Sequence, residues 1–392
     1  MRDFVAAIHP GRFGPWKETT VGELADDLLT YGVHDRDLPD HQGVIRAGDV
    51  RDGRVMANRP DGVATAITRK TRAVLKEGDL VVVLVRRVGD AALVTRQHAG
   101  WIATRSVGIV RAKDPRTTPW LRIWFRTPFA QSWIGRHVSA HVEPTLSLDA
   151  LKKMQVWVPP REQIDKLCEL VALIEAKTDL NRQIAAGAVA VADACHASWA
   201  RHRASWTSCT FGTVARAVTG KSSPGASPED SETDITWVAP ADVLGTTMPY
   251  VGHAEHQGPA EPSAVCEPGT LLVASRPDGA RTAITLVPAA PRRGVLAVRP
   301  ADPEDRWWLL HELRSRSDEI PGIAQGRSAR EITGRAFARL GVAWPGPDVR
   351  RQFHTVAEPL HARARAALDE NRTLAELLDV LLRGVSSSTR RS

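Results

Sequence analysis

The segment GDLVVVLV, residues 78–85, opens on a turn pair and continues as an uninterrupted apolar run. An apolar run of this length bounded by Gly and Asp, here followed by Gly89 and Asp90, is typical of a buried β-strand. About 190 residues later, GTLLVA at residues 269–274 repeats the arrangement and is followed by Asp278 and Gly279. The recurrence indicates that one globular unit occurs twice in the chain.

Other segments repeat in the same order. VGIVR at residues 107–111 leads to an Asp-Pro pair, as does VLAVR at residues 295–299. VWVPP at residues 156–160 corresponds to VAWP at residues 342–345. At the start of each copy, VGELA (residues 21–25) corresponds to FGTVA (residues 211–215). Two similar units in one chain suit a ligand that is contacted at two places.

A long helical pattern follows each unit. Apolar or small side chains recur there at alternating spacings of three and four, typical of a coiled-coil seam. At 1.5 Å per residue, 40 residues make a helix of roughly 60 Å. The residues expected in the seam are Leu167, Val171, Ile174, Asn181, Phe353, Leu360, Asn371, Leu374, Leu378 and Leu381. A pair of Asn side chains in such a seam can fix its register; alternatively, one or both of Asn181 and Asn371 face solvent.

We therefore expect an α+β fold with two similar mixed α/β units, each followed by a long helix, the two helices pairing as an antiparallel coiled coil. The expected boundaries are residues 1–160 for the first unit, 161–205 for a central helix and 206–346 for the second unit. Residues 347–385 form the second helix and residues 386–392 a disordered tail.

Composition excludes several classes of protein. No apolar stretch approaches the roughly 18 residues of a membrane span, and the N-terminus has no apolar signal region, so we expect a cytoplasmic protein without a membrane partner. The four cysteines lie far apart without a C-x-x-C pair, which favours reduced thiols over a metal site. Residues 1–160 hold 24 basic and 17 acidic side chains, but residues 206–346 hold 14 and 16. Net charge alone therefore does not establish nucleic-acid binding.

Two motifs point to enzymes but lack the context that catalysis needs. ARAVTGKS, residues 215–222, fits a relaxed phosphate-loop pattern, yet the following SPGASP does not start the helix that such a loop requires. The proline pair in VPPR, residues 158–161, lacks the Asn or Asp and the aromatic residue of an adenine methyltransferase loop. The prolines are better explained as the end of a strand and the first turn of a helix. With no catalytic constellation, we expect a non-catalytic chain.

The landmarks together resemble the specificity (S) subunit of type I restriction–modification systems. They are Asp49-Val50 and Asp242-Val243 in an early strand, the Gly-Asp-apolar strand at residues 78–81, a segment from Ser147 (a candidate helix cap) to Leu151, and the junction VWVPPREQI at residues 156–164. The resemblance covers nearly the whole chain. The second copy departs from it, because WPGPD at residues 344–348 lacks the Glu-Gln of the junction.

The resemblance implies that each unit is a target recognition domain for one half of a bipartite sequence in double-stranded DNA. It also implies that the helices act as a ruler and dock methyltransferase (M) subunits, with restriction (R) subunits joining for cleavage in phage defence. The M subunit would supply S-adenosylmethionine for DNA methylation, and this chain would hold no cofactor and no metal.

Base edges and phosphates are contacted by Arg, Lys, Asn, Gln and His side chains on loops. Candidates in the first unit are Arg46, Arg51, Arg54, Asn58, Arg59, Arg69, Lys70, Arg86, Arg87, Arg96, Gln97 and His98. Candidates in the second are Lys221, Arg276, Arg281, Arg292, Arg293, Arg327 and Arg330. Two alternatives stay open: an S-like recognition subunit of another phage-defence or methylation-only assembly, and a non-DNA scaffold with two domains on a coiled coil.

Overall fold

The computed structural model describes residues 15–34, 43–57, 73–139, 143–221, 235–252, 257–258, 260, 262–276, 279–323 and 332–388. No helix in these ranges is long and apolar enough to cross a membrane. The chain divides into two compact units: unit 1 is residues 1–178 with 372–392, and unit 2 is residues 179–371. Each unit therefore contains part of both long helices. The boundaries expected from the sequence instead made each long helix a segment of its own, outside the two units.

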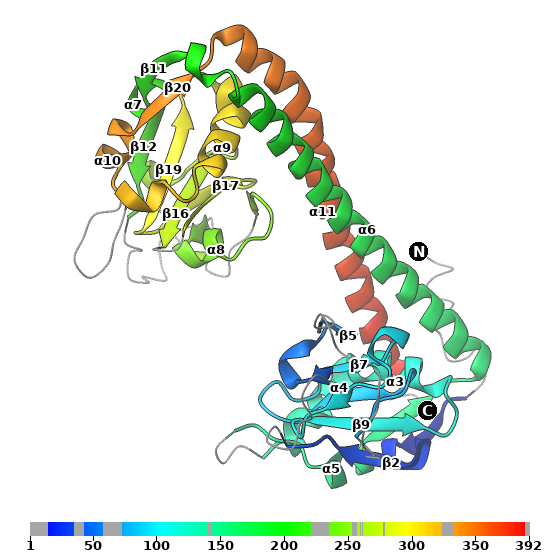
Figure 1. Cartoon of the computed structure of the whole chain (residues 1–392). Helices are drawn as coiled ribbons and strands as arrows, with labels where there is room; N and C mark the ends of the chain where they lie inside the picture. Colours follow the sequence, from blue (N-terminus) through cyan, green and yellow to red (C-terminus); the bar gives the residue numbers. More distant parts are fainter. Residues whose placement is uncertain are drawn as a thin grey trace. The chain divides into compact units, whose positions relative to one another are not determined.

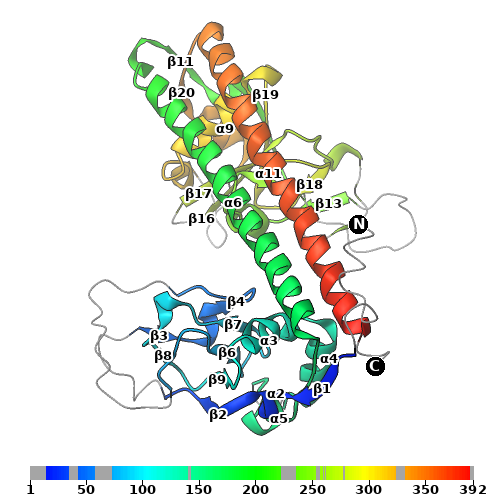
Figure 2. The same ribbon diagram turned by 90° about the vertical axis from the view of Figure 1, so that its right-hand side faces the viewer.

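Unit 1 is built on an antiparallel sheet with strand order β2–β9–β6–β7 (Figure 2). The strands are β2 (Ala25–Tyr31), β9 (Val107–Ala112), β6 (Leu80–Val83) and β7 (Ala91–Leu93). All four residues of β6 are buried. The buried strand expected from GDLVVVLV is therefore confirmed, although it ends at Val83.

Smaller elements surround this sheet. They are β1 (Lys17–Thr20), α2 (Val21–Leu24), β3 (Val44–Ile45), η3 (Ala47–Asp49), β4 (Val50–Arg51), β5 (Arg54–Val55), η4 (Arg96–His98), β8 (Ile102–Ala103), α3 (Thr117–Phe125), α4 (Pro128–His137), α5 (Leu148–Lys153) and β10 (Gln155–Val158). The core beside α3 is rich in tryptophan. A buried indole N–H needs an acceptor, and Trp120 and Trp124 donate to the carbonyls of Trp157 and Gln155, which ties α3 to β10.

Unit 2 has the same plan with a larger sheet, β12–β19–β16–β17–β14 (Figure 1). Its strands are β12 (Ala215–Thr219), β19 (Val295–Pro300), β16 (Leu271–Arg276), β17 (Gly279–Thr285) and β14 (Tyr250–Val251). The other elements are η5 (Arg203–Ser205), β11 (Thr207–Thr210), α7 (Phe211–Val214), β13 (Ile235–Val238), α8 (Pro240–Leu244), β15 (Gln257–Gly258), η6 (Pro262–Ala264), β18 (Ala289–Pro291), η7 (Pro303–Asp305), α9 (Arg306–Ser315), η8 (Ile320–Ile323), α10 (Gly334–Arg339) and β20 (Gly341–Trp344).

Close backbone contacts recur at equivalent places in the two units. A Cβ on Gly22 would lie 3.0 Å from the Lys152 carbonyl oxygen, and one on Gly212 would lie 2.9 Å from that of Ala338. The constraint is tighter where β2 and β12 end. A Cβ on Gly32 or on Gly220 would lie 2.2 Å from a carbonyl oxygen of the segment that leads into β9 or β19, respectively. The duplication read from the sequence is therefore a structural one.

One landmark of the repeat is a strand in unit 1 but a helix in unit 2. Val50 begins β4, but Asp242 and Val243 lie in the helix α8. Pro240 at the first turn favours a helix, and the Asp242 carboxylate accepts a hydrogen bond from the Ala239 N–H at 2.7 Å, which closes that turn. The expectation of a strand at Val243 is therefore wrong.

The junction between each unit and its long helix follows the predicted pattern. β10 ends at Val158, and helix α6 (Arg161–Ala200) starts directly after the proline pair. The junction's Gln163 is buried and accepts a hydrogen bond from the Trp16 indole at 3.0 Å. Helix α11 (Pro347–Ser388) begins with a proline. The expected cap is also present, because Ser147 accepts from the Ala150 N–H at the start of α5.

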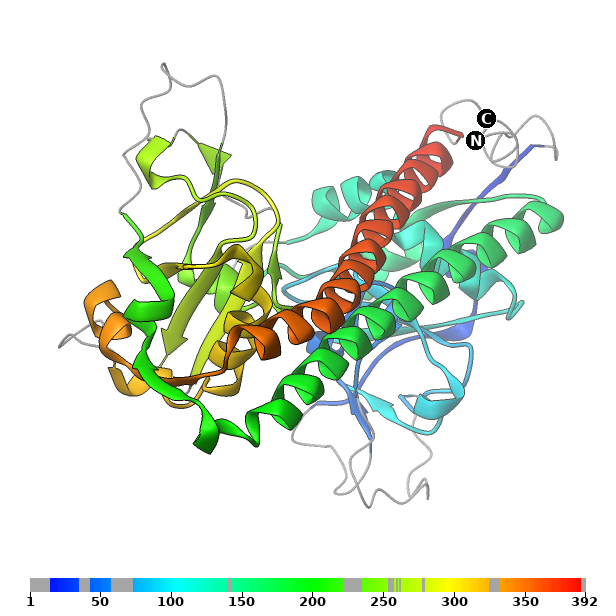
Figure 3. The same ribbon diagram turned by 90° about the horizontal axis from the view of Figure 1, so that it is seen from above.

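Within unit 2, the sections of α6 and α11 run antiparallel (Figure 3). The Trp199 ring meets the Phe353 ring at one end, and the Asn181 amide donates to the Asn371 side-chain oxygen, 3.1 Å away, at the other. Asn181 is fully buried, so its solvent-facing alternative is wrong. Phe353 is buried and Leu360 half-buried in the core of this unit.

Within unit 1, the expected seam residues Leu167, Val171 and Leu381 are buried in one cluster, with Leu378 packed against it. Ile174 is also buried, and Leu374 is half-buried. A continuous coiled coil along both helices stays a prediction. The helix α11 continues through Ser388, and the Ser386 hydroxyl accepts from the Phe129 N–H. The disordered tail expected from residue 386 therefore does not begin there.

A row of hydrogen-bonded polar side chains connects α6, α9, α11 and β14 in unit 2. Asp193 on α6 accepts from His311 Nδ1 on α9 (2.6 Å), His311 Nε2 lies 2.9 Å from His361 Nε2 on α11, and His361 Nδ1 lies 2.6 Å from the Tyr250 hydroxyl on β14. A carboxylate only accepts, so the neutral rings take one order: Tyr250 donates to His361, which donates to His311, which donates to Asp193. Burial lowers the pKa of both imidazoles, that of His361 to about 3.

The close approaches predict the effect of adding a methyl group. Gly32→Ala and Gly220→Ala should each lower the free energy of unfolding by roughly 2–3 kcal/mol, because the new Cβ overlaps a backbone oxygen, which cannot move aside as a flexible side chain can. Gly187→Ala on α6, where nothing lies within 4 Å of the Cβ position, should instead raise it by about 1 kcal/mol. Urea unfolding of the three variants measures this. Equal effects at all three positions would contradict the packing described.

The histidine chain predicts a pH dependence. Because the folded-state pKa of His361 is depressed, its contribution to stability is complete above pH 6.5 and is lost as pH falls from 6.5 toward 3. Between pH 7.5 and 5 the loss should be roughly 2 kcal/mol. The urea midpoint should fall less over this range in His361→Gln than in the unchanged protein. His202→Gln, at an exposed position of the same unit, should keep the full dependence; equal slopes in the two variants would rule out this role for His361.

Candidate nucleic-acid interface

A tight hairpin carries two of the arginines predicted in the first unit. Strands β4 and β5 pair directly, with Arg51 opposite Arg54. The two residues between them, Asp52 and Gly53, both have positive φ (50° and 78°), as a type I′ turn requires. The Asp-Gly dipeptide is the sequence signal for this hairpin, and the prediction from sequence did not use it. Arg51 is exposed and Arg54 is half-buried.

A second loop lies against this hairpin. Arg87 donates to the Val50 carbonyl at 2.7 Å and to the Ala47 carbonyl at 3.2 Å, so its side chain joins the loop after β6 to the start of β4. Arg86 has a φ of 68° and is exposed, with Glu143 2.8 Å away. The structure therefore brings the predicted residues of segments 46–54 and 86–87 together. Arg46, Arg51 and Arg86 are exposed there.

The hairpin rests on a buried ion-pair cluster. A Cβ on Gly53 would lie 2.9 Å from Arg122 Nη1 on α3. The same Nη1 donates to both Glu175 oxygens on α6, at 2.9 and 2.8 Å, and Arg126 adds a third bond at 2.7 Å. Glu175 is nearly buried, so these bonds are shielded from solvent. The loop surface of unit 1 is thus fixed to its long-helix section.

The remaining predicted residues of unit 1 divide into two kinds. Arg96 and Gln97 are exposed on the turn η4. His98 is buried, with Nε2 3.1 Å from the Ala57 carbonyl and its ring edge against Trp101. These contacts give His98 a role in the core, and the prediction that it contacts DNA is not supported by its position.

In unit 2, Lys221, Arg292 and Arg293 are brought together although 70 residues separate them in sequence. Lys221 forms an isolated parallel bridge with Arg292, and the Arg293 N–H donates to the Lys221 carbonyl. Glycine is required at the neighbouring position 220, because a Cβ on Gly220 would lie 2.2 Å from the Arg292 carbonyl oxygen. The Gly-Lys of the phosphate-loop pattern therefore belongs to this backbone crossing, which agrees with its rejection as a nucleotide loop.

The same crossing in unit 1 reveals a residue that the sequence prediction missed. Val33 bridges Thr104 as Lys221 bridges Arg292, which makes Arg105 the counterpart of Arg293. Arg105 is exposed, and its Nη1 donates to His34 Nε2 at 2.8 Å. An alignment of the two copies at VGIVR and VLAVR places Arg105 and Arg293 at the same position, two residues before each segment, and would have identified Arg105.

The other candidates of unit 2 are only partly described. Arg281 is exposed on β17, and Arg276 ends β16 without a described side chain. Asn58, Arg59, Arg69, Lys70, Arg327 and Arg330 lie outside the described residues. Within the described part, no cluster of His, Cys, Asp and Glu could hold a metal ion.

Comparison with known proteins gives one relative by sequence. No protein-family model matches the chain. A stretch of 170 residues, 42% of the chain, is 26% identical to the type I restriction enzyme EcoBI specificity subunit of Escherichia coli. This match covers 36% of that subunit, so the chain spans about a third of the length of this curated relative.

Solved structures match over nearly the whole chain. The type I restriction–modification S subunit from M. genitalium matches with a TM-score of 0.57 and 14% identity, over 95% of this chain and 96% of that one. The HsdS subunit from Thermoanaerobacter tengcongensis matches with a TM-score of 0.35 and 18% identity, over 94% and 97%. The first of these likenesses shows the fold. In sequence and in fold, the chain resembles the specificity subunits of type I restriction–modification systems.

Proposed function

We propose that this chain is the DNA specificity subunit of a type I restriction–modification complex. Unit 1 and unit 2 each read one half of a bipartite target, and the long helices set the gap between the halves. Methyltransferase subunits dock on the chain and supply S-adenosylmethionine, and restriction subunits join them for cleavage. The chain itself contributes sequence readout and no catalytic group.

The observation that carries this proposal is the duplication of a basic loop surface on one scaffold. Unit 1 presents Arg105 and unit 2 presents Arg293 at equivalent backbone crossings. In a duplex, two half-sites on one face lie about 34–36 Å apart or multiples of this. A pair of helices of 40 and 42 residues is long enough to hold two readers at such a distance.

The loops described above divide into support and readout. Arg87 donates hydrogen bonds to two backbone carbonyls, so we assign it the role of holding the two loops of unit 1 together. The exposed Arg51 and Arg86 are the candidates for contacts with phosphates or with guanine edges, to which arginine makes two hydrogen bonds. Arg86 would exchange its surface ion pair with Glu143 for such a contact. In unit 2, the exposed Lys221 and Arg293 are the candidates for contacts with DNA.

The first test measures DNA affinity as a function of salt. In a complex reconstituted with its methyltransferase subunit, Arg51→Ala with Arg86→Ala and, separately, Lys221→Ala with Arg293→Ala should weaken binding. A lost phosphate contact should reduce the slope of log K against log salt by about one, and a lost base contact should cost about 1–3 kcal/mol and relax one half of the target. Fluorescence anisotropy between about 50 and 200 mM salt measures both effects.

The controls are exposed arginines on other elements of the two units. Arg136→Ala on α4 and Arg216→Ala on β12 should leave affinity and slope unchanged. Weak binding of the unchanged complex that does not depend on salt would favour the non-DNA scaffold. If the complex binds DNA, and the gene for this chain lies next to a methyltransferase gene but no nuclease gene, a methylation-only assembly is favoured.

The second test concerns the ruler. Four residues inserted next to Asn181 and four next to Asn371 lengthen both helices by one turn while keeping the bond between these amides in register. The sequenced methylation target should keep both halves and gain a longer gap. Gly187→Ala, which alters α6 without lengthening it, should leave the gap unchanged. A change in either half-sequence on insertion would contradict the ruler role of the helices.

A further inference from the structure

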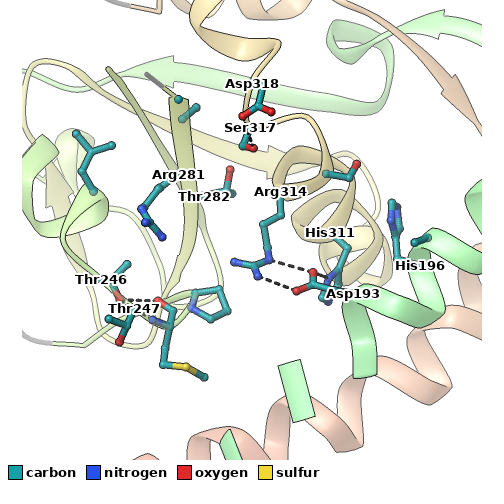
Figure 4. A pocket seen from close by; sticks show the side chains of 17 residues that line it. Asp193, His196, Thr246, Thr247, Arg281, Thr282, His311, Arg314, Ser317 and Asp318 are labelled. Atoms are coloured by element: carbon teal, nitrogen blue, oxygen red, sulfur yellow. Dashed lines mark hydrogen bonds and ion pairs between the residues drawn. The ribbon is translucent and has the colours of Figure 1, made fainter. Parts of the chain in front are cut away.

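Unit 2 contains a pocket that DNA readout does not require. Its volume is about 630 Å³, which lies within the roughly 300–1,000 Å³ of small-molecule sites. The pocket is formed by the end of α6, the loop before β14, the start of β17 and the C-terminal part of α9 (Figure 4). All its lining residues belong to unit 2.

Two guanidinium groups face this space. Arg281 makes no ion pair or hydrogen bond with any residue that the structure describes. Arg314 uses Nε and Nη2 to bind Asp193, at 3.2 and 2.8 Å, and its Nη1 makes no bond within the described part of the chain. Figure 4 shows the ends of both side chains directed into the same opening. The pocket therefore presents N–H donors and the guanidinium group of Arg281, which is not paired with a carboxylate among the described residues.

Thr282 follows Arg281 on β17 and is only 4% exposed. Its Oγ1 is covered from solvent, so this hydroxyl does not add to the donors that face the open space of the pocket. Arg281 and Thr282 both reach the pocket because β14 pairs only with Ile284 and Thr285, which leaves the start of β17 at the sheet edge.

The opposite side of the pocket is apolar. Leu244, Met248 and Pro249 line it. The acidic side chain Asp318 lies apart from the two guanidinium groups in Figure 4, where it accepts a hydrogen bond from the Ser317 hydroxyl. A ligand that uses both parts has an anionic group at one end and an apolar body at the other.

We propose that this pocket binds a small organic phosphate. Its phosphate oxygens accept from Arg281 and from Nη1 of Arg314, and its apolar part lies against Leu244, Met248 and Pro249. Phosphate suits the donors better than a carboxylate does, because it offers three oxygens and up to two negative charges to two guanidinium groups. The duplex is a poorer occupant, because its phosphates carry no apolar group that would enter the pocket. The inference does not depend on DNA recognition.

Isothermal titration calorimetry of the full chain tests it with three probes: inorganic phosphate, glycerol phosphate and phenyl phosphate. Phenyl phosphate should bind most tightly, because only it offers both the anion and an apolar ring. Arg281→Ala should weaken its binding at least tenfold. Arg216→Ala, an exposed arginine of β12 outside the pocket, should leave it unchanged.

Other results would overturn the proposal. Equal affinity for inorganic and phenyl phosphate would assign the site to free phosphate and remove the apolar half. Equal weakening by Arg281→Ala and Arg216→Ala would show binding to surface charge only. If no probe bound and Arg281→Ala weakened duplex binding instead, Arg281 would be a DNA contact. Because duplex binding is measured on the same variants, failure here is distinguishable from failure of the DNA-recognition proposal.

Discussion

In each unit, polar side chains connect the helix that follows the central strands to the long-helix sections of that unit. In unit 1 the connection is the Glu175 carboxylate of α6, which accepts three hydrogen bonds from Arg122 and Arg126. In unit 2 it is the chain from Asp193 through His311 to His361. The proposed DNA readout requires loops that hold their side chains in place. Both connections join the helix next to those loops to a long-helix section of the same compact unit.

The two connections occupy similar places but have different chemistry. Arginine keeps its charge at any pH that a cell experiences, so the unit 1 connection is a permanent ion pair. Unit 2 also has an arginine ion pair, between Arg314 and Asp193, but adds two neutral imidazoles to it. Burial of these rings costs less than burial of a charge, but they must donate and accept in one fixed order. Duplication therefore preserved the backbone plan, including the close contacts at Gly32 and Gly220, while the polar contacts between helices diverged.

Much of this plan was predictable from the sequence. The buried strand at Leu80–Val83, the cap at Ser147 and the helix start after Pro160 each follow from local residue chemistry. The strand expected at Val243 failed because Pro240 and Asp242 close a helical turn there. The histidine chain was not predictable, since Asp193, Tyr250, His311 and His361 are far apart in sequence and only the packing of four elements brings them together. For the same reason exposed Arg51 and buried His98 looked equally suitable for DNA contact.

The most direct test of the account is single-molecule sequencing of methyladenine in the DNA of the host, with this gene present and deleted. The account predicts a bipartite methylated motif with a fixed gap that disappears on deletion. It further predicts that Arg51→Ala with Arg86→Ala degrades one half of that motif, and Lys221→Ala with Arg293→Ala the other half. Methylation that persists unchanged without the gene would contradict the central claim that this chain selects the DNA target.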